Sequence, residues 1–198
     1  ALEVGAGTGN LSEFFTNLPD LTLTDVDPKL VDHLRHRFTN KRNVHVEIFD
    51  ISKQLYKIKN KFKTVYSVNV LEHIENDEKA LRNMSSLLVA GGRVVILVPA
   101  KKRAYKKLDK HLGHYRRYEK EELAEKMNRV GLEVEYISYF NTVGLLSWLI
   151  RDYIGGSHPD LKPSHVKIFD FFVPILRVIE PRRRLPIGIS LIAIGKRI

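Results

Sequence analysis

Short apolar segments alternate with helical patterns along most of the chain, and this alternation limits the fold more than any other feature. Strands are expected at Leu21 to Thr24, Val44 to Phe49, Phe62 to Val68 and in the apolar run RVVILVP at 93–99. A near-continuous apolar strand is typical of a parallel sheet that is covered on both faces. Strands and helices in this rhythm predict an α/β fold with a doubly wound, mostly parallel sheet.

The segments between these strands show helical spacing of apolar residues. Helices are expected at 11–18, from Pro28 with Asp27 as the cap, at 77–89 ended by Gly91-Gly92, and at 119–130 ended by Gly131. The dense positive charge after Pro99 predicts a loop or short helices outside the sheet. Capping residues before a helix and glycine after it are the usual end signals.

Two further strands are expected at 132–140 and from Ile189, separated by an apolar stretch that contains TVGLLSWLI. We therefore divide the chain into a main domain at 1–140 plus 186–198 and a helical insertion at 141–185. The insertion packs on the sheet, covers an apolar acceptor as a lid, or dips into an acidic membrane surface. The sequence leaves these alternatives open.

The chain is strongly basic, with 33 Lys and Arg against 23 Asp and Glu, a formal charge of +10. This balance favours an anionic partner such as nucleic acid, acidic lipid headgroups or a phosphorylated small molecule. The absence of cysteine excludes disulfides and thiolate metal sites. No apolar run approaches the roughly 20 residues that span a bilayer. We expect a cytoplasmic protein, with surface contact to an anionic membrane left open.

The chain opens on LEVGAGTGN, a short apolar strand followed by three glycines at every second position. Such a turn lets the backbone approach a ligand closely. In dinucleotide dehydrogenases the third glycine falls five positions after the first, whereas here it falls four after. Glu3, two residues before the turn, suits an ammonium or sulfonium cation better than a pyrophosphate.

Acidic residues stand at the ends of the next two expected strands, Asp25 and Asp50. In a doubly wound sheet, ligands bind beyond the carboxyl ends of the strands. One carboxylate can accept both hydroxyls of a ribose, and another can accept from the amino group of adenine. Each acid can instead be a helix cap or turn residue, and this is the reading that we prefer for Asp27.

Five segments in order resemble the class I S-adenosylmethionine-dependent methyltransferases, from the first residue to about residue 100. The segments are LEVGAGTGN, LTLTDVD, EIFDI, SVNVLEHIENDEKAL and LLVAGGRVVILVP. The resemblance implies a Rossmann-like sheet of seven strands with an antiparallel last strand, and S-adenosyl-L-methionine as cofactor. Family members usually carry one or two helices before the first strand, which the printed chain lacks, so we expect a truncated chain or weakened cofactor binding.

The resemblance also implies roles for individual residues. The methionine part of the cofactor would lie against the glycine turn, the ribose on the acid after the second strand, the adenine on the next residue and on the pair after the third strand, and the reactive end over the pair after the fourth. In that order the implied residues are Glu3, Gly5, Ala6, Gly7, Asp25, Val26, Asp50, Ile51, Asn69 and Val70.

The stretch LDKHLGHYRRY follows the fifth strand, where this family builds its substrate sites. Its GHYRRY part resembles a bacterial and archaeal branch of the family. His114 is the first candidate for a general base, and Tyr115 or Tyr118 for orienting the acceptor. Arg116 and Arg117 are candidates for gripping a phosphate or carboxylate.

The same residues have plainer interpretations. His114 and the two arginines can be exposed polar residues of a basic loop, and His73 can lie near the methyl group or cap its turn. Asp109, His111 and His114 lack a fourth ligand at a persuasive spacing, so we predict no metal site.

The sequence thus predicts methyl transfer from S-adenosylmethionine to an anionic or amphipathic small-molecule or lipid-linked acceptor. Two alternatives remain open at this point: an RNA methyltransferase, suggested by the charge, and a non-catalytic binding or regulatory protein on the same scaffold. Methyl transfer from a sulfonium is an in-line displacement, so alignment and exclusion of water are the main requirements on the protein.

Overall fold

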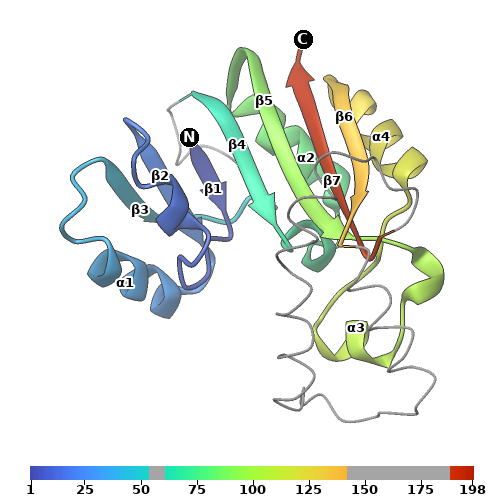
Figure 1. Cartoon of the computed structure of the whole chain (residues 1–198), viewed down its shortest axis with the longest axis horizontal. Coiled ribbons are helices and arrows are strands. Elements are labelled where there is room, and N and C mark those ends of the chain that lie inside the picture. The colour runs from blue at the N-terminus through green and yellow to red at the C-terminus, as the bar shows by residue number, and fades with distance from the viewer. Residues whose placement is uncertain (54–60, 142–187) are drawn as a thin grey trace.

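The structure is a computed structural model and describes residues 1–53, 61–141 and 188–198. Its strands form one sheet in the order β3-β2-β1-β4-β5-β7-β6 (Figure 1). They are β1 (Leu2–Val4), β2 (Leu21–Asp25), β3 (Val44–Ile48), β4 (Phe62–Val68), β5 (Leu88–Pro99), β6 (Leu132–Phe140) and β7 (Ser190–Arg197). The first five strands run parallel, and β7 is antiparallel to both β5 and β6. The predicted fold class, a seven-stranded sheet with an antiparallel last strand, is confirmed.

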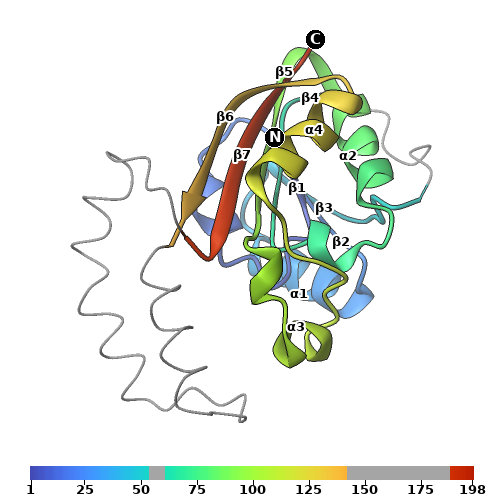
Figure 2. The same cartoon turned by 90° about the vertical axis from the view of Figure 1, so that its right-hand side faces the viewer.

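Helices cover both faces of this sheet. The α-helices are α1 (Pro28–Arg37), α2 (Asp77–Ser86), α3 (Lys107–His111) and α4 (Lys120–Arg129), and short 3-10 helices are η1 (Ser12–Phe15), η2 (Leu71–His73) and η3 (Lys102–Ala104). Helices α2 and α4 lie side by side against β5 and β6 (Figure 2). Neighbouring residues of β4 point to opposite faces: Val65 packs in the core with Leu81 of α2, and Tyr66 packs with Leu34 of α1. The sheet is therefore doubly wound.

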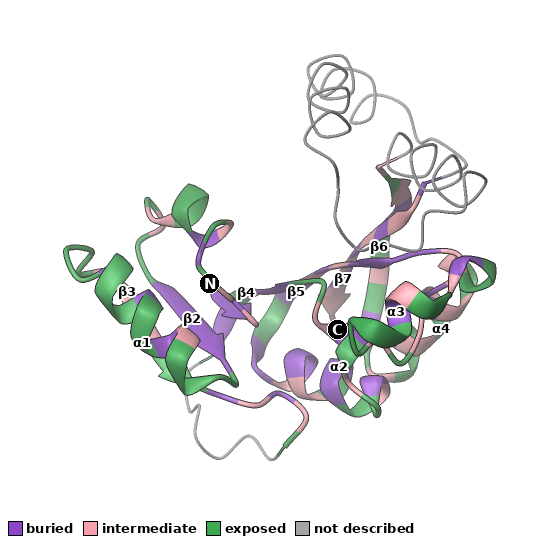
Figure 3. Ribbon diagram, turned by 90° about the horizontal axis from the view of Figure 1, so that it is seen from below, coloured by how far each residue is buried: buried purple, intermediate pink, exposed green. Residues whose placement is uncertain are grey.

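Helix α1 begins as its sequence predicts. The carboxylate of Asp27 accepts a hydrogen bond from the Lys29 backbone N–H at 2.8 Å, and Pro28 occupies the first turn. Val31 and Leu34 are buried against the sheet, while most of the opposite side of the helix is exposed (Figure 3). Strands β1 and β2 are buried along their whole lengths, so the elements that end at the candidate site are anchored in the core.

The helix predicted at 11–18 is wrong, because the structure has only the single 3-10 turn η1 there. Phe14, expected on the buried face, is 80% exposed. The Ser12 hydroxyl donates to the buried carboxylate of Glu3 at 2.6 Å, which ties the start of this segment to β1. Pro19 follows within one turn of η1, and proline cannot continue a helix.

The predicted end of the second long helix is also wrong. Helix α2 ends at Ser86, and β5 already begins at Leu88, which pairs with Phe62 of β4. Gly91 and Gly92 therefore lie inside β5, at the irregularity where its register against β4 shifts. A Cβ on Gly92 would stand 3.0–3.1 Å from three carbonyl oxygens, so close backbone packing, and not the end of a helix, requires this glycine.

The basic stretch after Pro99 contains η3 and α3 and lies outside the sheet, as predicted (Figure 1). The insertion expected at 141–185 falls outside the described residues except at its first position. Across the described parts of the chain, none of the helices combines the length and the apolar character needed to cross a membrane.

A buried carboxylate ties α2, α4 and the GHYRRY segment together. Asp77, at the start of α2, is 4% exposed. It accepts hydrogen bonds from Lys126 of α4 and from the Tyr118 hydroxyl at 2.9 Å, and it pairs with Arg116 at 3.0 Å. Burial opposes the charge, but Lys126, Tyr118 and Arg116 together hold the pKa of Asp77 below its ordinary value of 3.8.

The substitution Asp77→Asn tests this junction. We expect it to lower the free energy of unfolding at pH 7 by about 3 kcal/mol, because two cations lose a buried partner. The folded pKa of Asp77 is lowered, so its stabilisation is present above pH 3.8 and is lost as the pH falls through the folded value. Denaturant unfolding from pH 7 to pH 3 measures both effects.

Glu78→Gln is the matched control, since Glu78 pairs with Arg129 of α4 at the exposed surface. It should cost at most about 1 kcal/mol. Equal losses for the two variants at pH 7, or a loss for Asp77→Asn that grows in acid, would contradict this interpretation.

Candidate functional site

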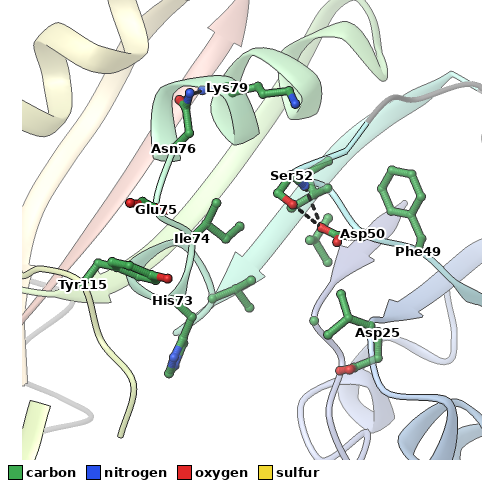
Figure 4. Close-up of a pocket in the computed structure, with 15 residues that line it drawn as sticks. Asp25, Phe49, Asp50, Ser52, His73, Ile74, Glu75, Asn76, Lys79 and Tyr115 are labelled. Carbon is green, nitrogen blue, oxygen red and sulfur yellow. Dashed lines mark hydrogen bonds between the residues drawn. The ribbon is translucent and has the colours of Figure 1, made fainter. Parts of the chain in front are cut away.

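A cavity of about 560 Å³ opens at the carboxyl ends of β1 to β4, within the size range of small-molecule sites (Figure 4). It is lined by Val4, Gly5, Asp25, Val26, Phe49, Asp50, Ile51, Ser52, Val70, His73, Ile74, Glu75, Asn76, Lys79 and Tyr115. Strands β1 to β4 are parallel, so their carboxyl ends meet at one edge of the sheet. This arrangement places residues from four distant parts of the sequence around one space.

The glycine turn after β1 borders the cavity through Gly5 and lies against the end of β2. The backbone N–H groups of Gly5 and Ala6 both donate to the Thr24 carbonyl, at 2.9 and 2.8 Å, which holds the turn against β2. Gly5 has φ +74°, and a Cβ there would stand 2.4 Å from a methyl carbon of Val70, after β4. Glycine is required at this position by both backbone conformation and space.

Glu3 lies behind the turn and outside the cavity lining. It is buried and accepts hydrogen bonds from the Ser12 hydroxyl at 2.6 Å and the Tyr66 hydroxyl at 3.0 Å. Burial raises the pKa of Glu3 even though both hydrogen bonds oppose the rise. Glu3 is therefore held by Ser12 and Tyr66 and is not among the residues that line the cavity.

Asp25 and Asp50 stand on one side of the cavity, and His73, Ile74 and Tyr115 stand on the other (Figure 4). The two oxygens of Asp25 accept from the backbone N–H groups of Gly7 at 2.9 Å and Asp27 at 3.0 Å. Each carboxylate oxygen can accept a second hydrogen bond. Asp25 thus fixes the glycine turn and keeps acceptor capacity for a ligand.

Asp50 is held by the residues that follow it. One of its oxygens accepts from the Ser52 N–H at 2.9 Å and the Ser52 hydroxyl at 2.6 Å, and the other lies 3.1 Å from the Lys53 ammonium. Burial opposes ionisation, but Ser52 and Lys53 hold the pKa of Asp50 below its usual range. Asp50 is therefore a charged acceptor at neutral pH.

Apolar surface completes this half of the cavity. Val26 is 62% exposed at the rim, although it follows a fully buried strand, while Ile51 is buried behind Asp50. Exposed valine beside two carboxylates suits a flat heterocycle that carries hydroxyl and amino groups. The described residues thus fit an adenosine group, with acceptors at two strand ends and a close backbone turn between them.

At the opposite end, the lining residue His73 contacts a second histidine, which is bound to a buried aspartate. The rings of His73 and His114 meet edge to face, with centroids 4.7 Å apart. Asp109 is 1% exposed and accepts from His114 Nδ1 at 3.0 Å and from Arg117 Nε at 2.8 Å. Burial opposes its charge, but Arg117, the Lys106 backbone and His114 hold the pKa of Asp109 low. An ionised Asp109 can only accept, so the hydrogen bond places a proton on Nδ1 of His114, and in the neutral ring the lone pair is then on Nε2.

The GHYRRY segment runs alongside residues 71–77. The Tyr115 N–H donates to the Glu72 carbonyl at 2.8 Å, and Arg116 donates to the Glu75 carbonyl at 2.6 Å as well as pairing with Asp77. Tyr118 is fully buried. Both arginines proposed from the sequence to grip an anion therefore bind acidic side chains of this chain, and only Tyr115 of this segment lines the cavity.

The structure thus brings Gly5, Asp25, Val26, Asp50, Ile51, Val70 and Tyr115 to one cavity. Ala6 and Gly7 continue the glycine turn, and Asn69, with φ +53°, follows β4 beside the lining residue Val70. His114 is not among the residues that line the cavity, but its ring contacts that of the lining residue His73.

Sequence reasoning missed Glu72 and the role of Asp109. Glu72 is 0% exposed, and neither of its carboxylate oxygens has a hydrogen-bond partner among the described residues. Burial raises the pKa of Glu72 to about 7. An acid next to a histidine in LEHIE was visible in the sequence, but its burial depends on the distant GHYRRY segment.

Comparison with known proteins decides the family. The family model described as methyltransferase domain matches residues 1–137. The chain belongs to this family. It is an S-adenosylmethionine-dependent methyltransferase. No curated protein matches the chain.

Solved structures show the same fold for this methyltransferase. A chain from the complex of the Haloferax volcanii Trm112 methyltransferase activator with a methyltransferase matches 98% of this chain and 80% of its own length, at 14% identity and TM-score 0.67. The N-methyltransferase NodS from Bradyrhizobium japonicum, solved with S-adenosyl-L-homocysteine, matches 99% and 76% at 16% identity and TM-score 0.62. A TehB-like SAM-dependent methyltransferase from Corynebacterium glutamicum matches 100% and 79% at 20% identity and TM-score 0.58.

The contact between the glycine turn and β4 generates a stability prediction. Gly5→Ala should destabilise the chain by about 3 kcal/mol, since positive φ and overlap with Val70 act together. Gly7→Ala, with φ +56° and no described atom within 4 Å of its Cβ position, should cost only about 1–2 kcal/mol of backbone strain. Denaturant unfolding of both variants measures the difference.

The substitution Val70→Ala in the Gly5→Ala background removes the overlapping methyl groups. It should recover part of the lost stability. Equal costs at the two glycines, or no recovery, would show that the turn does not depend on this contact.

Proposed function

We propose that this methyltransferase transfers the methyl group to an anionic or amphipathic small-molecule or lipid-linked acceptor, bound beside Tyr115, His73 and His114. The observation that supports the proposal is that Asp25 and Asp50 line one side of the cavity and His73 and Tyr115 the other (Figure 4), with His114 and Asp109 in contact next to His73. The first side suits the adenosine of the cofactor, and the second suits proton transfer at an acceptor.

The cofactor-binding residues are proposed from this placement together with the family resemblance. Asp25 would accept from the ribose hydroxyls, Val26 would lie against adenine, and Asp50 with Ile51 would meet the adenine edge. The methionine part would lie along Gly5, Ala6 and Gly7, with Glu3 in the strand just before the turn, and the reactive end near Asn69 and Val70. When bound, S-adenosylmethionine supplies an electrophilic methyl group on a sulfonium centre.

We propose His114 as the general base when no metal ion is bound to the chain. The Nε2 lone pair of the neutral ring can accept the proton of a hydroxyl or amine acceptor. Asp109, whose Oδ1 lies 3.0 Å from His114 Nδ1, keeps the other proton on Nδ1 and stabilises the imidazolium that forms. Burial and the neighbouring His114 lower the pKa of His73, which keeps that ring neutral. The Tyr115 side chain, 54% exposed at the cavity, is proposed to orient the acceptor.

The nature of the acceptor is proposed from the surroundings of this end. The segment between β5 and α4 carries exposed basic residues, among them Arg103, Lys106, Lys107 and Lys110. Leu112 is exposed next to the GHYRRY segment. Positive charge favours an anionic group on the acceptor, and exposed leucine and tyrosine favour an apolar part. We also propose that 141–185 forms a cap over the acceptor, and that the GHYRRY segment defines a branch of the family with this acceptor site.

The substitution His114→Ala tests the catalytic proposal. Transfer of label from methyl-labelled S-adenosylmethionine to a panel of anionic and amphipathic hydroxyl and amine acceptors should fall by about 100- to 10,000-fold. Calorimetric affinity for S-adenosyl-L-homocysteine should stay within about twofold, because His114 lies outside the cofactor half.

His111→Ala is the control, since His111 is exposed at the end of α3 and outside the cavity lining. It should retain the rate of the unsubstituted chain. Unchanged turnover in His114→Ala would remove this residue from the mechanism. Labelling of RNA with none of the small acceptors labelled would contradict the proposed acceptor class.

A further inference from the structure

Three side chains at the acceptor end form a compact set of metal-ligand atoms. One carboxylate oxygen of Glu72 and one ring nitrogen each of His73 and His114 all lie within 4.8 Å of one another. They come from η2 and from the GHYRRY segment, which the Tyr115 N–H to Glu72 carbonyl hydrogen bond holds together. Two imidazoles and one carboxylate are the ligand set of many catalytic zinc sites and of other open transition-metal sites.

The buried carboxylate is an independent sign of a ligand. Glu72 is 0% exposed, and both of its oxygens lack a hydrogen-bond partner among the described residues. Buried polar groups in proteins are nearly always satisfied, and one that is not calls for a specific explanation. The nearby guanidinium of Arg117 binds Asp109 and the Ala100 carbonyl. The charge of Arg117 favours the ionised form of Glu72, but neither Glu72 oxygen accepts a hydrogen bond among the described residues. A cation between Glu72 and the two histidines would supply that direct contact.

The outer contact of His114 also matches a metal centre. Asp109 lies 3.0 Å from Nδ1 of His114. This imidazole thus has one ring nitrogen engaged by an outer acceptor, which leaves the other for coordination. Metal-ligating histidines almost always show this second contact, because it fixes the tautomer and the ring orientation.

We propose that Glu72, His73 and His114 bind a divalent first-row transition-metal ion of the zinc type. Three protein ligands leave coordination positions open, and His73 lies on the cavity wall. The mixed nitrogen and oxygen donors favour such an ion over Mg²⁺ or Ca²⁺, which prefer oxygen alone. The absence of a metal site predicted from Asp109, His111 and His114 differs from this proposal because the burial of Glu72 beside His73 is not visible in the sequence.

The purpose of the site rests on the proposed function. An acceptor hydroxyl bound at an open position would lose its proton to solvent at a lower pH, because the cation stabilises the alkoxide or phenolate. The new O–C bond would then form as the S–C bond breaks, and the thioether would leave as a neutral molecule. In the metal-loaded chain His114 is a ligand through Nε2, and the base role described above belongs to the metal-free chain.

Calorimetry on the chelator-stripped full chain tests the site without any acceptor or methyl donor. Titration with ZnCl₂ should show one equivalent of tight binding. Glu72→Gln, which keeps the side-chain shape, and His73→Ala should each weaken it by about 100-fold or more, and Asp109→Asn by about 10- to 100-fold. MgCl₂ in excess should not compete.

Two further measurements distinguish the loss of a metal site from a failure of the variant to fold. CoCl₂ should give visible absorption bands in the unsubstituted chain and in the His111→Ala control, and lose them in Glu72→Gln. Saturating ZnCl₂ should raise the unfolding midpoint of the unsubstituted chain and leave that of Glu72→Gln unchanged, which also shows that the variant folds.

The proposal is overturned if Zn²⁺ does not bind at millimolar concentration, or if it binds equally to all variants, as adventitious surface histidines would. A failure of zinc binding would not decide whether the proposed function is correct. That function is judged by S-adenosyl-L-homocysteine affinity and by the turnover of His114→Ala, both measured in the presence of chelator.

Discussion

The half of the cavity that we propose for the cofactor depends on how the carboxylate of Asp25 binds two turns at once. One oxygen holds the Gly7 N–H of the turn after β1, and the other holds the Asp27 N–H just before α1. Both turns follow buried parallel strands, so the rigid sheet fixes the positions of their donors. A carboxylate that is already positioned by backbone donors costs little to organise when a ribose binds. In the proposed cofactor site, the sheet therefore fixes the position of the Asp25 carboxylate.

The acceptor half depends on buried charge rather than on strand ends. Asp77 and Asp109 are both nearly inaccessible, and each is neutralised by a basic residue of the GHYRRY segment. These pairs dock that segment onto residues 71–77 and thereby bring His114 against His73. Part of the strong basic charge of the chain is thus used internally. Glu72 is the exception at this junction, because neither of its oxygens has a hydrogen-bond partner in the part of the chain that the structure describes, and the proposed cation would provide one.

The local sequence was sufficient to predict most strands and the start of α1, because apolar periodicity and the Asp27-Pro28 cap act over a few residues. It also predicted that Asp25 and Asp50 would face one site, since parallel strands share a carboxyl edge. It did not predict the pairing of Arg116 with Asp77 or the burial of Glu72. Those features come from contacts between segments about forty residues apart, which no local pattern records.

A crystal structure of the full chain with S-adenosyl-L-homocysteine tests most directly whether this edge of the sheet holds an adenosyl cofactor. We predict density for the ribose on Asp25, for adenine between Val26 and Asp50, and for the sulfur pointing toward His73 and Tyr115. Density for the nucleoside elsewhere, with Asp25 and Asp50 making no contact to it, would contradict the cofactor site described for this methyltransferase.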